Sequence, residues 1–89
     1  MLNKRAVQKQ IIRSLISTST WGGKHTELRN LKKGLPTILT STKKWQKLIN
    51  KAIKDLINKQ FLLIKPSTGE LHASLNTKMK KEIIELLKW

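Results

Sequence analysis

One segment of this sequence is apolar along one side and basic along the other. Over residues 42–60, the apolar side chains share one face of a helical wheel, which is the periodicity of an amphipathic α-helix. That face holds Trp45, Leu48, Ile49, Ala52, Ile53, Leu56 and Ile57. The opposite face holds Lys43, Lys44, Lys47, Lys51 and Lys54. A helix of this kind has to bury its apolar face, so the segment predicts a folded domain packed around it.

The residues before this segment predict two further helices. Residues 3–17 repeat the amphipathic pattern, with their apolar side chains on one face. Thr26 is suited to be an N-cap, and Glu27 would lie near the positive end of the helix dipole. Gly34 is a typical residue for the position after a helix. Together these signals predict a short helix over 26–33.

The remaining segments contain extended structure and a last helix. The run 17–21 is rich in hydroxyl and β-branched residues, which favours a short strand, and a loop is expected over 22–25. Residues 61–75 consist of two β-prone runs around a Pro/Gly turn, which predicts a hairpin. Residues 78–88 again have helical apolar spacing. The whole chain is therefore expected to form one α+β domain, mostly α.

Composition limits the chemistry of this domain. The chain has 89 residues, no cysteine, and 19 Lys+Arg against 5 Asp+Glu, so its formal net charge is +14. Without cysteine there is no disulfide and no thiolate zinc site, and two histidines do not complete a metal site alone. We therefore expect no metal and no cofactor. The large positive charge indicates a polyanionic partner, with nucleic acid first and an anionic membrane second.

The sequence gives no sign of membrane insertion. No run approaches the roughly 18 uncharged apolar residues that a membrane-spanning helix needs. Basic residues interrupt the N-terminal region where a signal peptide would have its apolar core. We expect a cytoplasmic protein.

The order of the predicted elements resembles that of winged helix-turn-helix DNA-binding domains. Helix, short extended segment, helix, longer helix, two-stranded hairpin and helix follow one another over nearly the whole chain. The stretches 22–26, 30–36 and 65–76 are similar to small archaeal winged-helix proteins of unassigned role. This resemblance implies a wing sheet of two or three strands. It also implies that the third helix enters the major groove, while the second helix and the wing contact the DNA backbone.

The residues suit these implied roles by their own chemistry. The candidates on the third helix are Ser41, Thr42, Lys43, Lys44, Gln46, Lys47, Asn50, Lys51 and Lys54. The candidates for backbone and wing contacts are Arg5, Lys9, Lys24, His25, Arg29, Lys32, Lys33, Lys65 and Thr68, with Glu70 partly opposing the wing. Lysine outnumbers arginine 16 to 3. Because lysine binds phosphate as a point charge, we expect phosphate contacts to dominate affinity, with modest base selectivity from Gln46, Asn50 and the hydroxyl residues at the start of the helix.

The last helix differs from the others because its charges are nearly balanced. Its lysines alternate with Glu82 and Glu85, and its apolar face ends close to the C-terminal Trp89. Two interpretations remain open: the helix joins two copies in a homodimer, or it covers its own chain. The candidate dimer residues are Ile83, Leu86, Leu87 and Trp89.

Double-stranded DNA binding, most simply by a transcriptional regulator, is the first hypothesis for function. A module that binds structured RNA or a ribonucleoprotein is the second, although an aromatic-poor sheet argues against the stacking platforms used for single strands. A protein-interaction domain or a membrane-active cationic protein is the third. The five carboxylates show no useful catalytic spacing, and there is no nucleophile motif or phosphate-binding glycine loop, so no enzyme activity is expected.

Overall fold

The computed structural model describes residues 3–32, 35 and 42–88. In this part the chain forms three α-helices and a three-stranded antiparallel sheet, consistent with a winged-helix-like arrangement. The elements follow as α1 (Lys4–Ser17), β1 (Thr26–Glu27), the 3-10 helix η1 (Leu28–Lys32), α3 (Lys43–Asn58), β2 (Leu62–Ser67), β3 (Glu70–Leu75), the 3-10 helix η2 (Thr77–Met79) and α4 (Lys80–Leu87). The predicted α+β class is confirmed.

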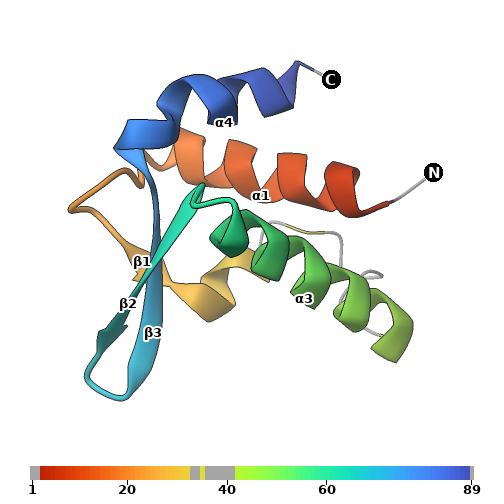
Figure 1. The fold of residues 1–89 in the computed structure, drawn as a ribbon. Helices are drawn as coiled ribbons and strands as arrows, with labels where there is room; N and C mark the ends of the chain where they lie inside the picture. The colour runs from red at the N-terminus through yellow and green to blue at the C-terminus, as the bar shows by residue number, and fades with distance from the viewer. Residues whose placement is uncertain (1–2, 33–34, 36–41, 89) are drawn as a thin grey trace.

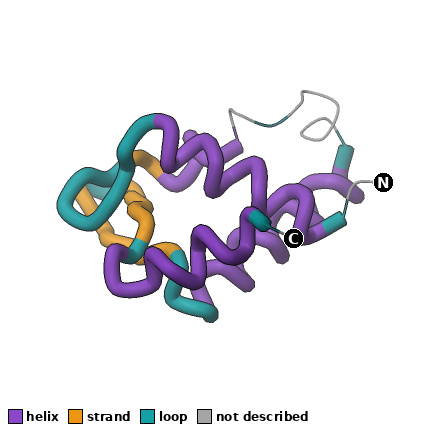
Figure 2. Tube along the Cα trace, turned by 90° about the horizontal axis from the view of Figure 1, so that it is seen from above, coloured by secondary structure: helices purple, strands orange, loops and turns teal. Residues whose placement is uncertain are grey.

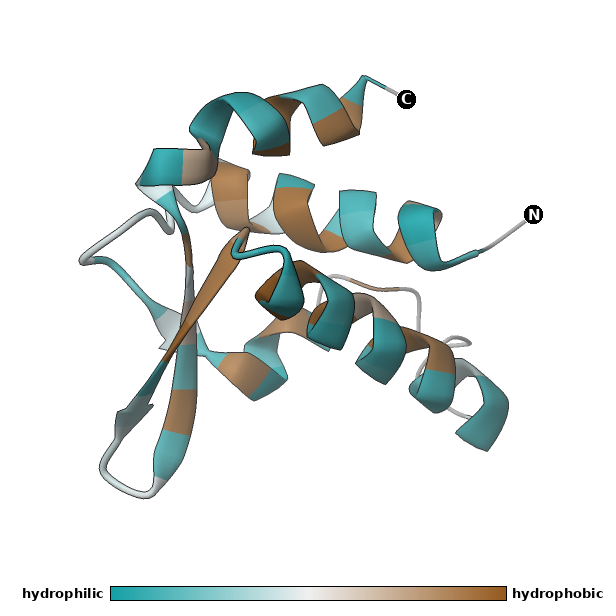
Figure 3. Cartoon of the chain, viewed as in Figure 1, coloured by the Kyte–Doolittle hydropathy of each residue, from teal (hydrophilic) through white to brown (hydrophobic). Residues whose placement is uncertain are grey.

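The helices lie on one side of the molecule and the sheet on the other. α1 lies between α3 and α4, and the β2–β3 hairpin projects away from the helices (Figure 1). Seen from above, the strands gather at one end of the helices (Figure 2). All three helices contribute buried apolar residues, among them Ile11, Ile49 and Ile83, and hydrophilic positions predominate on the side of α3 that is turned away from α1 (Figure 3). The core lies between α1, α3, α4 and the sheet.

The long helix α3 forms where its sequence predicts it. The Thr42 side chain caps its first turn by accepting a hydrogen bond from the Trp45 amide, with an N···O distance of 3.3 Å. On its inner face, Ile49, Ala52 and Leu56 are buried. The helix ends at Asn58, and the predicted range to residue 60 includes the turn that follows it.

A buried amide joins α1 to α3. The Asn3 side chain caps α1 by accepting a hydrogen bond from the Ala6 amide, at 2.9 Å. One turn later, Gln8 is almost fully buried. Its Nε2 donates to the Ala52 carbonyl at 3.1 Å and to the Asp55 carboxylate at 2.8 Å. This contact orients the two helices with respect to each other.

The predicted helix over 26–33 is wrong at its beginning. Thr26 and Glu27 form the strand β1, pairing with Ala73 and His72 of β3, so Thr26 is not a helix N-cap. Pairing with β3 supplies backbone partners that a helical turn would otherwise supply. The Thr26 hydroxyl accepts from the Asn30 side chain at 3.2 Å. The helical part is the 3-10 helix η1, and the predicted end at residues 33–34 lies outside the described residues.

The predicted strand over 17–21 is also wrong. α1 continues to Ser17, because the backbone amide of Thr18 donates to the Ser14 carbonyl at 3.2 Å as part of the helix, and the hydroxyls of Ser17 and Thr18 donate to the same carbonyl. Only Trp21 makes a β-bridge, to Leu75 of β3. The loop predicted over 22–25 is confirmed.

The predicted hairpin forms, and its turn is tighter than the sequence indicated. β2 and β3 pair from Leu62 with Leu75 out to Ser67 with Glu70, which leaves Thr68 and Gly69 as a two-residue loop. Both loop residues have positive φ, +46° and +79°. The sheet order β1-β3-β2 makes β2 an edge strand, where Pro66 is tolerated.

The last helix begins later than predicted. The Asn76 side chain accepts from the Lys78 amide at 3.1 Å and starts the 3-10 turn η2, and α4 itself starts at Lys80. Its inner residue Ile83 is fully buried in the core of its own chain.

Candidate nucleic-acid interface

The outer side of α3 carries an uncompensated row of lysines, which we call the lysine face. It consists of Lys43, Lys44, Lys47, Lys51 and Lys54. All five are exposed, opposite the buried side of the helix. None of them forms an ion pair within the described part of the chain. The five positive charges therefore act together on whatever approaches this side of α3.

Asp55, the acidic residue of α3, is engaged by groups other than the lysine face. Its Oδ2 accepts from Gln8 at 2.8 Å and lies 3.1 Å from Lys59 Nζ and 3.7 Å from Lys4 Nζ. The hydrogen bond from Gln8, followed by Lys59 and Lys4, holds the pKa of Asp55 below its ordinary value against the effect of burial. Asp55 is thus an anion that stabilises the α1–α3 contact.

A groove between η1 and α3 brings together residues predicted on separate helices. It has a volume of about 300 Å³, with apolar residues such as Leu28 and Ile53 in its wall. Its polar lining consists of Arg29 and Lys32 from η1 and Asn50 and Lys54 from α3. These four candidate residues, which belong to two separate elements, therefore line one groove.

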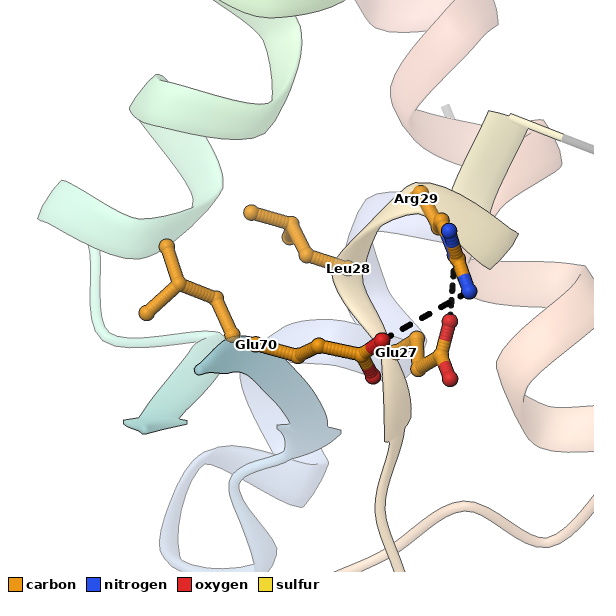
Figure 4. Close-up of a pocket in the computed structure, with 5 residues that line it drawn as sticks. Glu27, Leu28, Arg29 and Glu70 are labelled. Carbon is orange, nitrogen blue, oxygen red and sulfur yellow. Dashed lines mark hydrogen bonds and ion pairs between the residues drawn. The ribbon is translucent and has the colours of Figure 1, made fainter. Parts of the chain in front are cut away.

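Arg29 is held by carboxylates of the chain itself. Its Nε is hydrogen-bonded to Glu27, and its Nη2 lies 3.6 Å from Glu70 Oε1 (Figure 4). The bond to Arg29 is the main cause that lowers the pKa of Glu27. In turn, Glu27 and then Glu70 raise the pKa of Arg29. The charge of Arg29 is therefore largely compensated, and a phosphate would have to compete with two carboxylates for it.

Two histidines join the loop before β1 to the wing. Nδ1 of His25 lies 2.7 Å from Nδ1 of His72, and the rings meet edge to face with their centroids 4.6 Å apart. One ring has to donate and the other has to accept, so at least one is neutral while this bond exists. His25 was predicted as a phosphate contact, and the structure instead gives its Nδ1 a partner within the protein.

Arg5 and Lys9 of α1 are not among the residues that line the groove between η1 and α3 or a groove at the N-terminal ends of α1 and α3. Gln8 marks the side of α1 that faces α3. At 3.6 residues per turn, Arg5 and Lys9 lie about 60° and 100° around the helix from Gln8. Arg5 and Lys9 therefore lie on the same side of the edge of α1 that Gln8 marks, whereas Lys4 of α1 lines the groove at the N-terminal ends together with Lys44, Lys47 and Lys51 of α3.

The other predicted contact residues lie on separate parts of the fold. Lys24 is exposed in the loop before β1, Lys65 is exposed on β2, and Thr68 is at the tip of the hairpin. Gln46 is exposed on α3, and Thr42 uses its hydroxyl as the α3 cap. Lys33 and Ser41 lie outside the described residues.

The candidate dimer residues are mostly used by the fold itself. Ile83 is 0% exposed and Leu86 is 8% exposed, both packed in the core of their own chain. Leu87 is half-buried against this core, and Trp89 lies outside the described residues. Ile83 and Leu86 therefore pack in the core of their own chain, as the second of the two open interpretations has it, and the homodimer stays a prediction.

The sequence did not reveal a second groove, at the N-terminal ends of α1 and α3. It has a volume of about 520 Å³ and is lined by Lys4 of α1 and by Lys44, Trp45, Lys47, Leu48 and Lys51 of α3, together with Asn3. Helical periodicity placed Trp45 on the apolar face of one helix. It could not show that the N-terminal end of α1 lies beside it.

Other kinds of site are not found in the described ranges. Over residues 3–32, 35 and 42–88, no three His, Asp or Glu side chains gather as metal ligands would. None of the helices described here is long and apolar enough to cross a membrane. Comparisons of the chain with protein-family models, with curated proteins and with solved structures each found no match.

Proposed function

We propose that this protein binds double-stranded DNA through the lysine face of α3, most simply as a transcriptional regulator. The observation that carries the proposal is the exposure of five lysines on one side of a single helix, without ion pairs to the described residues. An α-helix fits the major groove of B-DNA, and lysines along such a helix reach the phosphates on its borders.

The neighbouring elements support this proposal. The winged-helix-like arrangement places the β2–β3 hairpin as a projecting wing, with Lys65 exposed along it (Figure 1). The groove between η1 and α3 adds Lys32 to the lysine face at Lys54. Contacts with phosphates on both sides of one DNA groove would follow from these positions.

Base selectivity is expected to be modest. Asn50 is exposed beside the lysine face, and its amide can form two hydrogen bonds with the major-groove edge of adenine. Arg29, which lines one groove with Asn50 and Lys54, is engaged by Glu27 and Glu70. The bidentate reading of guanine by arginine is therefore not favoured at this site, and phosphate contacts dominate.

A salt titration of duplex binding tests the proposal. Fluorescence anisotropy at several salt concentrations gives the slope of log K against log salt. Lys47→Ala and Lys51→Ala should each reduce the magnitude of that slope by about 0.9 for each lost phosphate contact. Lys81→Ala is the matched control, because Lys81 is an exposed lysine on α4. Equal affinities of the wild type and a Lys43, Lys47 and Lys51 triple alanine variant would refute the assignment.

Two further binding measurements identify the kind of nucleic acid that the protein prefers. Competition between duplex DNA and duplex RNA at one salt concentration should favour DNA, and a tenfold preference for RNA would replace the proposal by structured-RNA binding. A ratio of about 10³ between a cognate upstream sequence and a scrambled duplex supports a regulator. A ratio near one indicates a general DNA-binding protein.

A further inference from the structure

The groove at the N-terminal ends of α1 and α3 combines an apolar wall with a basic rim. Trp45 and Leu48 supply the apolar part, and both are half-buried against the core. Lys4, Lys44, Lys47 and Lys51 supply the rim. Among the described residues that line it, none is acidic. An occupant of this groove therefore needs negative charge together with an apolar surface.

Trp45 makes a flat aromatic occupant the best match. Lys44 Nζ lies over the Trp45 ring, 5.9 Å from its centroid, so a base that stacks on the indole would take the place of this ammonium group, which is then close enough to bind the phosphate. The volume of about 520 Å³ lies within the range of pockets that hold small organic ligands. A nucleotide unites the required properties, because its base stacks on an indole and its phosphate binds an ammonium group.

We propose that this groove binds an unpaired nucleotide, its base against Trp45 and its phosphate between Lys44 and Lys47. The inference rests on the proposed nucleic-acid binding by α3, and it adds the kind of nucleic acid that binds most tightly. A base within a continuous duplex is stacked on its neighbours and does not present its face. A duplex with a single-stranded overhang provides both parts: paired DNA for the lysine face and a free base for the groove.

The site lies on helices and not on the sheet. The stacking surfaces that many single-strand-binding proteins use are aromatic residues of a sheet or barrel, and this sheet has few. Here the indole belongs to α3 itself, between the lysine face and α1. One helix would therefore contact both the paired and the unpaired part of one DNA molecule.

Anisotropy titrations with two labelled probes test the inference. One probe is a blunt duplex of about 20 base pairs, and the other is the same duplex with a short thymidine overhang. Stacking of one base changes affinity by roughly 5- to 100-fold. We expect the wild type to bind the overhang probe more tightly by a factor in this range, at the same salt concentration.

Three variants identify the residue responsible. Trp45→Leu should bring the ratio of the two affinities close to one and change the affinity for the blunt probe by less than about twofold. Trp45→Phe keeps an aromatic ring and should retain part of the preference. Trp21→Leu is the matched control, since Trp21 is also half-buried and has Lys80 Nζ 5.9 Å from its ring centroid, yet it does not line this groove.

The outcomes separate the inference from the proposed function. Equal affinities of the wild type for the two probes would refute the groove and leave duplex binding intact. A preference that persists in Trp45→Leu would also refute it. Binding of the overhang probe without binding of the blunt probe would support the groove and overturn duplex binding. Circular dichroism on each variant establishes that it is folded, and Trp45→Phe keeps the test decisive if Trp45→Leu unfolds.

Discussion

The bond between Gln8 and Asp55 is expected to contribute a large share of the stability of this domain. The Gln8 amide is buried, and its Nε2 has two acceptors, the Ala52 carbonyl and the Asp55 carboxylate. Asp55→Ala removes the charged acceptor and leaves one amide hydrogen of Gln8 without its partner. Because the two residues are 47 positions apart, the change acts on the packing of α1 against α3.

The contacts of Asp55 determine how much unfolding free energy the substitution Asp55→Ala should remove. A hydrogen bond to a charged group contributes about 1.5–3 kcal/mol. The ion pairs of Asp55 with Lys4 and Lys59 involve half-exposed lysines and add about 0–1 kcal/mol. Asp55→Ala should therefore lower the free energy of unfolding by about 2–4 kcal/mol. In a Gln8→Met background the same change should cost only the ion-pair part, about 0–1 kcal/mol.

Urea unfolding of the four proteins in this double-mutant cycle measures the coupling directly. We expect a coupling free energy of about 1.5–3 kcal/mol between Gln8 and Asp55 at neutral pH. Lys4→Gln is the control, because it removes an ion pair to Asp55 without touching Gln8, and it should cost less than about 1 kcal/mol. A coupling below about 0.5 kcal/mol would refute the reasoning.

The same cycle has a defined pH dependence. The pKa of Asp55 is lower in the folded protein than its ordinary value, first because Gln8 donates to the carboxylate. The stability that Asp55 contributes is therefore complete above the ordinary carboxyl pKa and is lost as the pH falls through the lowered folded pKa. The coupling should decrease in acid over that window and stay constant at higher pH. A coupling that increases in acid would contradict this assignment.

Two further substitutions test the wing and the last helix. Thr68→Asn should raise stability by about 0.5–1 kcal/mol, because a β-branched residue at φ +46° is strained and Asn-Gly suits a two-residue loop with positive φ at both positions. Thermal unfolding should show a higher Tm, and an unchanged or lower Tm would contradict the turn geometry. Ile83→Ala should cost about 2–5 kcal/mol, since the side chain is fully buried in its own chain. A loss below about 1 kcal/mol, or a Tm that rises with protein concentration, would instead place Ile83 at a contact between copies.

The parts of the fold that could be predicted are those whose signals are local. The helix α3 contains its own cap at Thr42, its apolar spacing and its lysines, so both its position and its lysine face could be predicted. The strand β1 has two residues, which is too short for an alternation of polar and apolar side chains. Its partner Ala73 is supplied by a distant part of the chain, and only that pairing makes Thr26 extended.

The same distinction applies to the candidate site. Lys4 and Lys44 line one groove because α1 packs on α3 through Gln8, and nothing within either helix indicates that packing. Arg29 was predicted to contact the DNA backbone because its guanidinium group can bind phosphate. Its ion pair with Glu70 depends on how the wing folds back toward η1, so its compensation could not be predicted from the residues near it in the sequence.

The placement of the acidic residues explains why α3 keeps its charge. The chain has 5 acidic residues against 19 basic ones. Four of the acidic residues form ion pairs with basic residues outside the lysine face: Glu27 and Glu70 with Arg29, Asp55 with Lys4 and Lys59, and Glu85 with Lys88. Neutralisation thus takes place between η1 and the neighbouring strands β1 and β3, at the α1–α3 contact and at the end of α4. Five like charges on one side of a helix repel each other, so without an anionic partner they do not stabilise the folded state. Among the described residues, the absence of compensating carboxylates at the lysine face is therefore the strongest indication of an anionic partner. The net charge of the chain is a weaker indication.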